Sequence, residues 1–195
     1  LHWATGNTRW LAEAKKAFDF WNENYVNPET GQVCDGVDAK TGKLHWDVYS
    51  YNQGMMIGAA ACLYKVTKDQ SYLNSVEKIV KFVLRNETHP VSGVLFEHAD
   101  GSPCRSNDRD CLEFLGITFR FLLDYYFQME DQDVLKVLDS TIRSVLTYMS
   151  DGSTTFPLSW TGPKLLDGTV TDLSSQTSGL SALLKWTAFK CNWMT

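Results

Sequence analysis

The sequence predicts an all-α protein built from repeated helical hairpins, and three observations indicate this fold. First, an apolar pair recurs at a fixed spacing of 62 residues, as Trp10-Leu11, Tyr72-Leu73 and Val134-Leu135. Second, apolar residues around each copy follow one another at three or four positions, the spacing of one helical face. Third, amphipathic helices alternate with helices that are apolar almost all round. The length of 195 residues indicates a single domain, 1–195, with about three repeats.

The amphipathic helices each follow a short polar break whose Asn or Asp can cap the first free amides of the helix. These breaks are Thr5-Gly6-Asn7, Thr67-Lys68-Asp69 and Met129-Glu130-Asp131. The apolar helices precede the breaks, and the runs 55–61 and 119–127 are their most apolar parts. A helix that is apolar on every face is buried on every face, so we expect Cys62 to be a buried thiol. Each repeat is therefore an inner helix, a tight turn, an outer helix and a long loop.

The loops predicted at 27–48, 87–110 and 149–172 each lead from an outer helix to the next inner one. They must gather at one end of the array, and loops of this length are usually functional. We therefore expect the binding face at that end.

The two ends of the array predict an incomplete ring. Residues 1–2 align with the last turn of an inner helix at 63–64, and 176–189 form an inner helix without an outer partner. An open array would expose apolar faces, which a closed toroid buries. We expect about half of a closed ring of six inner and six outer helices, an (α/α)6 barrel.

The composition and the motifs exclude several classes of function. The net charge is −5, from 18 Lys and Arg against 23 Asp and Glu, and both signs are mixed along the chain, so we expect no nucleic-acid partner. The longest apolar run, 55–63, is too short for a membrane span. No phosphate-binding glycine loop or nucleophile elbow occurs, and the four His are scattered, so we expect no cofactor and no metal.

Two features indicate the compartment. Cys104 and Cys111 lie in one polar loop and favour a local disulfide over two free thiols. Asn86 begins the glycosylation pattern Asn-Glu-Thr. Together they favour a secreted protein or one associated with the cell wall or cell surface. Cys34 and Cys191 have no evident partner.

Three groups on the loop face are candidates for substrate binding. Trp46 and the segment Tyr51-Asn52-Gln53 offer flat aromatic faces and neutral hydrogen bonds for a sugar, with a helix cap and core aromatics as the alternative. The repeat-equivalent acids Asp35 and Glu97 could act as acid and base, or could order the loops as acceptors. Trp160 could stack on a sugar or fill the loop core.

At this point the sequence resembles glycoside hydrolase family 76, the α-1,6-mannanases. The resemblance rests on Tyr49-Ser50-Tyr51-Asn52-Gln53-Gly54 before an apolar helix, on Leu63-Tyr64, Thr67 and Tyr72-Leu73, on 27–36, on Phe114-Leu115-Gly116-Ile117 and on Trp160-Thr161-Gly162-Pro163. It implies an (α/α)6 barrel and retaining endo-hydrolysis of α-1,6-mannan, or transglycosylation of mannose-containing glycans.

The resemblance also implies two adjacent catalytic aspartates in the N-terminal half of the barrel, and no Asp-Asp pair occurs in this sequence. The resemblance thus implies that this chain is the C-terminal half of the barrel and that the N-terminal half is absent. We therefore assign no catalytic residue here and expect this chain to supply the C-terminal half of a carbohydrate-binding cleft. The alternative from another class is a non-catalytic glycan-binding or scaffolding repeat protein. A sugar epimerase on a similar barrel would need catalytic His residues on inner helices, and no internal His lies within one.

Overall fold

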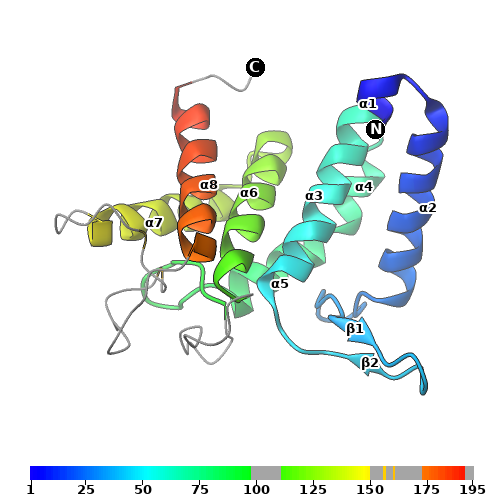
Figure 1. Cartoon of the computed structure of the whole chain (residues 1–195), viewed down its shortest axis with the longest axis horizontal. Helices are drawn as coiled ribbons and strands as arrows, with labels where there is room; N and C mark the ends of the chain where they lie inside the picture. Colours follow the sequence, from blue (N-terminus) through cyan, green and yellow to red (C-terminus); the bar gives the residue numbers. More distant parts are fainter. Residues whose placement is uncertain (98–110, 150–155, 157–159, 161–172, 192–195) are drawn as a thin grey trace.

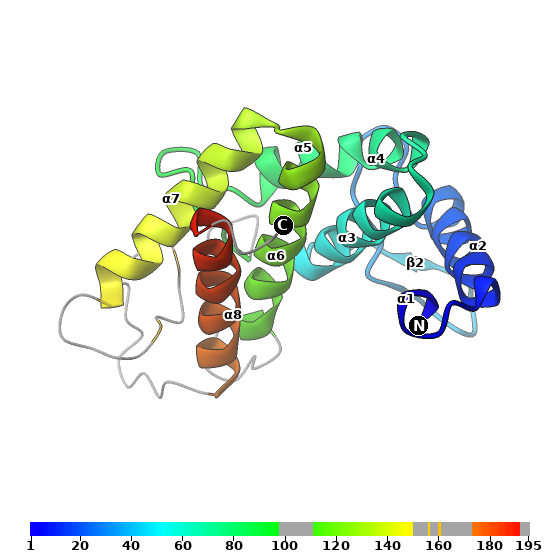
Figure 2. The same cartoon turned by 90° about the horizontal axis from the view of Figure 1, so that it is seen from above.

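The computed structural model describes residues 1–97, 111–149, 156, 160 and 173–191, and it shows two layers of helices (Figures 1 and 2). The inner layer holds α3 (Ser50–Thr67), α6 (Cys111–Met129) and α8 (Leu173–Lys190), preceded by the short α1 (His2–Thr5). The outer layer holds α2 (Thr8–Asn24), α4 (Ser71–Ser75), α5 (Glu77–Asn86) and α7 (Gln132–Met149). The predicted alternation of inner and outer helices is confirmed.

The first long loop contains a small hairpin that the sequence analysis did not predict. Its strands are β1 (Gly36–Val37) and β2 (Leu44–His45), which pair antiparallel with Gly36 opposite His45. The Asp38 carboxylate accepts the backbone N–H groups of Lys40 and Thr41 and so closes the turn between the strands.

The repeat of 62 residues is exact in the backbone at the turns that end the inner helices. Gly6, Lys68 and Glu130 adopt left-handed backbone conformations, with φ of 66°, 59° and 52°. Each N–H donates to the carbonyl four residues earlier, which closes the last turn of α1, α3 and α6 respectively.

The predicted caps of the outer helices are confirmed as well. Asn7, Asp69 and Asp131 each accept a hydrogen bond from the backbone N–H two residues further on, at 2.9, 3.0 and 2.9 Å. A polar side chain at this position satisfies a helical amide that would otherwise lack a partner.

The inner helices pack closely because glycine lies at the contact points. Gly54 of α3 lies against the backbone of Thr118, and Gly116 of α6 lies against Ser178 of α8. The Gly116 N–H donates to Ser178 Oγ at 2.9 Å, across 62 residues of sequence. As a result α6 lies between α3 and α8, and the core fills the space between this row and the outer helices.

The described loop segments share one hydrogen-bond pattern and lie at the same end of the array (Figure 1). Cys34 N–H donates to the Tyr25 carbonyl at 2.8 Å, and 62 residues later Phe96 N–H donates to the Glu87 carbonyl at 3.1 Å. This end is also where α3 begins. The predicted gathering of the loops is confirmed for the residues described.

One sequence prediction was wrong, because α3 is not buried on every face. Met55 is 51 % exposed, and the Cys62 thiol is exposed instead of buried. Both residues line hollows between α2 and α3, where no other described element covers this stripe of α3. In the described part of the chain, Cys34, Cys62 and Cys191 are free thiols, and no helix is both long and apolar enough to cross a membrane.

Candidate functional site

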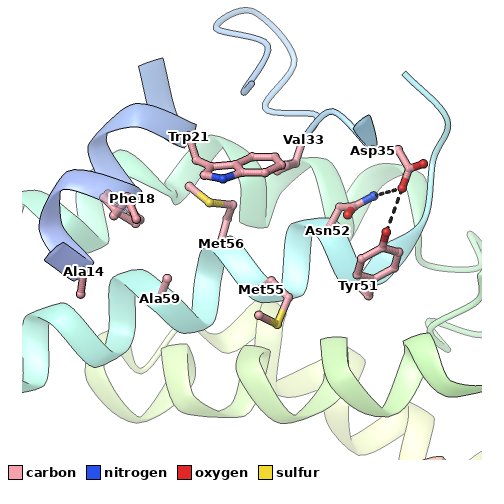
Figure 3. Close-up of a pocket in the computed structure, with 11 residues that line it drawn as sticks. Ala14, Phe18, Trp21, Val33, Asp35, Tyr51, Asn52, Met55, Met56 and Ala59 are labelled. Carbon is pink, nitrogen blue, oxygen red and sulfur yellow. Dashed lines mark hydrogen bonds between the residues drawn. The ribbon is translucent and has the colours of Figure 1, made fainter. Parts of the chain in front are cut away.

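A hollow of about 550 Å³ lies between α2 and α3 and opens toward the loop end (Figure 3). Its wall is mostly apolar, and its lining residues are Ala14, Ala17, Phe18, Trp21, Val33, Asp35, Tyr51, Asn52, Met55, Met56 and Ala59. Below it, Ala14 and Ala59 also line a second hollow of about 340 Å³, beside Trp3, Trp10 and Cys62. The two hollows therefore form one groove along α2 and α3.

The polar end of the groove is built around one carboxylate oxygen. The Tyr51 hydroxyl donates to Asp35 Oδ1 at 3.0 Å, and Asn52 Nδ2 donates to the same oxygen at 2.8 Å (Figure 3). Asp35 is held in turn by the hairpin, since its N–H donates to the His45 carbonyl at 2.9 Å. Three of the seven predicted binding residues therefore meet at the mouth of the hollow.

Burial, together with the hydrogen bond to the Asp35 carboxylate, raises the pKa of Tyr51 to about 12. Tyr51 is therefore a neutral donor at physiological pH. A phenol, an amide and one carboxylate beside aromatic carbon form the kind of surface that binds an uncharged polyol.

Glu97, the repeat equivalent of Asp35, lies in the interior and caps α3. Its Oε1 accepts the Ser50 N–H at 2.8 Å, and its Oε2 accepts the Ser50 hydroxyl at 2.6 Å. Its side chain is nearly enclosed, and the positive end of the helix dipole favours a carboxylate there. This geometry corresponds to the loop-ordering alternative for Glu97.

Gln53 points away from the hollow, although it follows Asn52 directly. It is fully buried, and its Nε2 donates to Glu87 Oε1 at 2.7 Å. Glu87 is also fully buried, and burial together with the Glu97 carboxylate raises its pKa well above the ordinary value. Gln53 is thus part of an interior network and does not line the hollow.

The two predicted tryptophans lie in different surroundings. Trp46 is 39 % exposed on the segment between β2 and α3, and its carbonyl accepts Gln32 Nε2 at 2.7 Å. Trp160 is buried, its ring meets Phe119 edge to face, and its carbonyl accepts the Ser144 hydroxyl at 2.6 Å. Trp160 therefore fills the core, and Trp46 lies outside the groove.

A model of glycosyl hydrolase family 76 matches residues 1–192, almost the whole chain. The chain belongs to glycosyl hydrolase family 76. The family suggested by the sequence motifs is confirmed. No curated protein matches the chain.

Solved structures show the same fold in part of a family 76 barrel. The Lin0763 protein from Listeria innocua is 23 % identical with a TM-score of 0.81, over 98 % of this chain and 52 % of that one. The GH76A α-1,6-mannanase from Salegentibacter sp. HEL1_6 is 23 % identical with a TM-score of 0.75, over 95 % and 54 %. Dfg5 from Chaetomium thermophilum, in complex with glucosamine, is 22 % identical with a TM-score of 0.76, over 93 % and 46 %. This chain spans about half the length of these proteins.

Sequence reasoning missed Trp21, whose indole forms a wall of the hollow opposite α3 (Figure 3). One signal could have found it. The repeat places Val83 and Val145 at the same position, and both are fully buried. An aromatic residue at a position that holds a core valine in the other two repeats indicates a surface that binds a ligand or partner instead of packing in the core.

The remaining predictions concern glycosylation, a disulfide and metal binding. Asn86 ends α5 half-buried, and its Nδ2 donates to the Phe82 carbonyl at 3.0 Å. Cys104 lies outside the described residues, so its disulfide with Cys111 stays a prediction. Where the structure describes side chains, no cluster of three or more His, Cys, Asp or Glu converges as a metal site.

Proposed function

We propose that the protein containing this chain hydrolyses mannan at α-1,6 linkages and that this chain, 1–195, forms one side of the cleft. The family match over residues 1–192 carries the proposal. An inactive variant of the Salegentibacter α-1,6-mannanase was solved in complex with α-1,6-mannotetrose, which supports the substrate class. The same cleft would serve transglycosylation, in which a mannose-containing glycan is transferred to another sugar and not to water.

The polar end of the hollow is the proposed sugar contact. Sugar hydroxyls can donate to the Asp35 carboxylate and accept from Asn52, while Trp21 offers an apolar face. Trp46, exposed on the segment before α3, is proposed as a further stacking surface. The remainder of the groove is mostly apolar and suits packing against protein.

The catalytic carboxyl groups are proposed to come from elsewhere in the protein. A retaining glycosidase needs two carboxyl groups about 5 Å apart at the sugar. This sequence has no adjacent Asp pair, and Glu97 is committed to the first turn of α3. We therefore propose that these three repeats bind and orient the glycan, as part of a single ring-shaped domain.

The second candidate is a glycan-binding or scaffolding protein without catalysis. One observation favours it: the repeat-equivalent acids Asp35 and Glu97 both accept hydrogen bonds from the first turn of α3. A protein that uses its carboxylates in this way can bind sugars without cleaving them.

The test is an assay of the natural protein on α-1,6-mannan, with new reducing ends and product lengths measured together.

Replacing Asn52 by Ala should raise KM about tenfold, the value of one hydrogen bond, and leave Tm within a few degrees. Asn74→Ala, on the exposed face of α4, is the matched control. Binding without cleavage would favour the second candidate, longer products would indicate transfer, and neither binding nor cleavage would refute both.

Secretion or attachment at the cell surface is part of the proposal, with a Cys104–Cys111 disulfide and a glycan on Asn86. The amide of Asn86 would have to leave the Phe82 carbonyl to carry a glycan. Mass spectrometry of peptides from the natural protein, with and without reduction, tests both modifications. Unmodified Asn86 together with reduced Cys104 and Cys111 would contradict this part of the proposal.

A further inference from the structure

The side chains of Gln53 and Glu87 form an enclosed pair outside the candidate site. Gln53 belongs to the first turn of α3, and Glu87 directly follows α5. Both residues are fully buried, and Gln53 Nε2 donates to Glu87 Oε1 at 2.7 Å. This bond joins an inner helix to an outer one at the loop end.

One side-chain oxygen of each residue has no hydrogen-bond partner among the residues that the structure describes. These atoms are Gln53 Oε1 and Glu87 Oε2, and both are completely buried. An amide oxygen only accepts, and an ionised carboxylate only accepts. With Glu87 ionised, two buried acceptors would lack a donor, which is costly in a folded protein.

We propose that Glu87 carries a proton on Oε2 and donates it to Gln53 Oε1, so that two hydrogen bonds close a ring between the acid and the amide. This one proton gives both oxygens a hydrogen-bond partner, because Glu87 Oε2 becomes the donor and Gln53 Oε1 the acceptor. No bound water or cation is needed for either.

The charges around the pair favour the neutral acid. Glu97 is the ionisable group that acts on Glu87 within the described chain, and it too is buried. The neighbouring side chains of α3, Ser50 and Gln53, do not ionise. Burial and repulsion by a second carboxylate both disfavour a negative charge on Glu87.

The ring makes Glu87 a positioning residue. The α3 turn that it holds carries Tyr51 and Asn52, which meet Asp35 at the mouth of the hollow. The inference concerns the protonation of the network and does not rest on the proposed function.

The decisive variant is Glu87→Gln, tested in the natural protein. A glutamine amide has nearly the same shape and donates to Gln53 Oε1 as the protonated acid would. A raised pKa in the folded state means that stability is fully present below the ordinary carboxyl pKa and is lost as the pH rises through the folded value. Between the ordinary carboxyl pKa and the raised pKa of Glu87 in the folded state, the unfolding equilibrium constant of the wild type should rise by up to about tenfold per pH unit relative to that of Glu87→Gln.

Glu87→Ala is the matched control, because it removes both hydrogen bonds. It should destabilise the protein at every pH, whereas Glu87→Gln should fold as stably as the wild type at pH 4. If Glu87→Gln is as unstable as Glu87→Ala at every pH, or if calcium or sodium ions stabilise the wild type and not Glu87→Gln, the proposal is overturned.

An infrared spectrum gives a second readout that a purely structural role would not move. At neutral pH the wild type should show the C=O band of a protonated carboxylic acid, and Glu87→Gln should lack it. Should that variant fail to fold, the wild-type spectrum decides alone, since the absence of a protonated carboxyl band at neutral pH would refute the proposal.

Discussion

Asp35 Oδ1 accepts hydrogen bonds from two consecutive residues of α3, so each donor can be tested separately. Tyr51→Phe should cost about 1 kcal/mol of unfolding free energy at neutral pH, the value of one hydrogen bond. Because the pKa of Tyr51 is raised to about 12, this contribution is present below pH 10 and is lost as the pH rises through 12. Urea unfolding at several pH values measures it. Tyr72→Phe, whose ring meets Phe18 edge to face, is the control, and equal losses in both variants would contradict the role of Asp35.

The sequence predicted Asp35, Tyr51 and Asn52 for the site because their chemistry and their place before an apolar helix can be read directly. It could not show that Gln53 faces inward. Successive helical residues point about 100° apart, so only the position of a partner decides which one faces the site. For Gln53 that partner is Glu87, 34 residues away, and its burial depends on packing that no local pattern records.

The helices themselves were predictable because their signals are local and occur three times. The caps at Asn7, Asp69 and Asp131 and the left-handed turns just before them keep one spacing through the chain. Whether a face of an inner helix is covered is not local. The exposure of Met55 and Cys62 depends on whether another element packs against that face of α3, and the residues of α3 do not show this.

The close contact of α3 with α6 depends on Gly54. A Cβ at this position would lie 2.8 Å from Thr118 Cα, which is backbone and cannot rotate away. Gly54→Ala should therefore lower the unfolding free energy by about 1–3 kcal/mol, although alanine is the better helix former. Gly36→Ala is the control, because a Cβ there meets nothing within 4 Å. Denaturant unfolding measures both, and a Gly54→Ala variant as stable as the wild type would contradict the predicted clash.

At the scale of the whole molecule, large apolar side chains are exposed along both edges of the inner row. Trp3 and Met55 are 68 % and 51 % exposed at one edge, and Leu180 and Leu184 of α8 are 48 % and 61 % exposed near the other. Isolated exposed apolar residues are ordinary, whereas contiguous groups mark surfaces that pack against protein. Because the chain spans about half of its structural relatives, we propose that the rest of a closed ring covers these edges.

Cys62 reports on this closure, because its thiol lies in the groove between α2 and α3 and is exposed in this structure. In the isolated 195-residue chain, a maleimide reagent should modify Cys62 without denaturant. In the natural protein the same thiol should be protected until the ring unfolds, since a covering helix would exclude the reagent. Mass spectrometry of the labelled peptide gives both rates, and Cys62→Ser identifies the peptide. Equal labelling rates in the two samples would mean that the groove stays open and would contradict the closed barrel. A scaffold that binds partners along α2 and α3 would then be the better explanation of the exposed apolar residues.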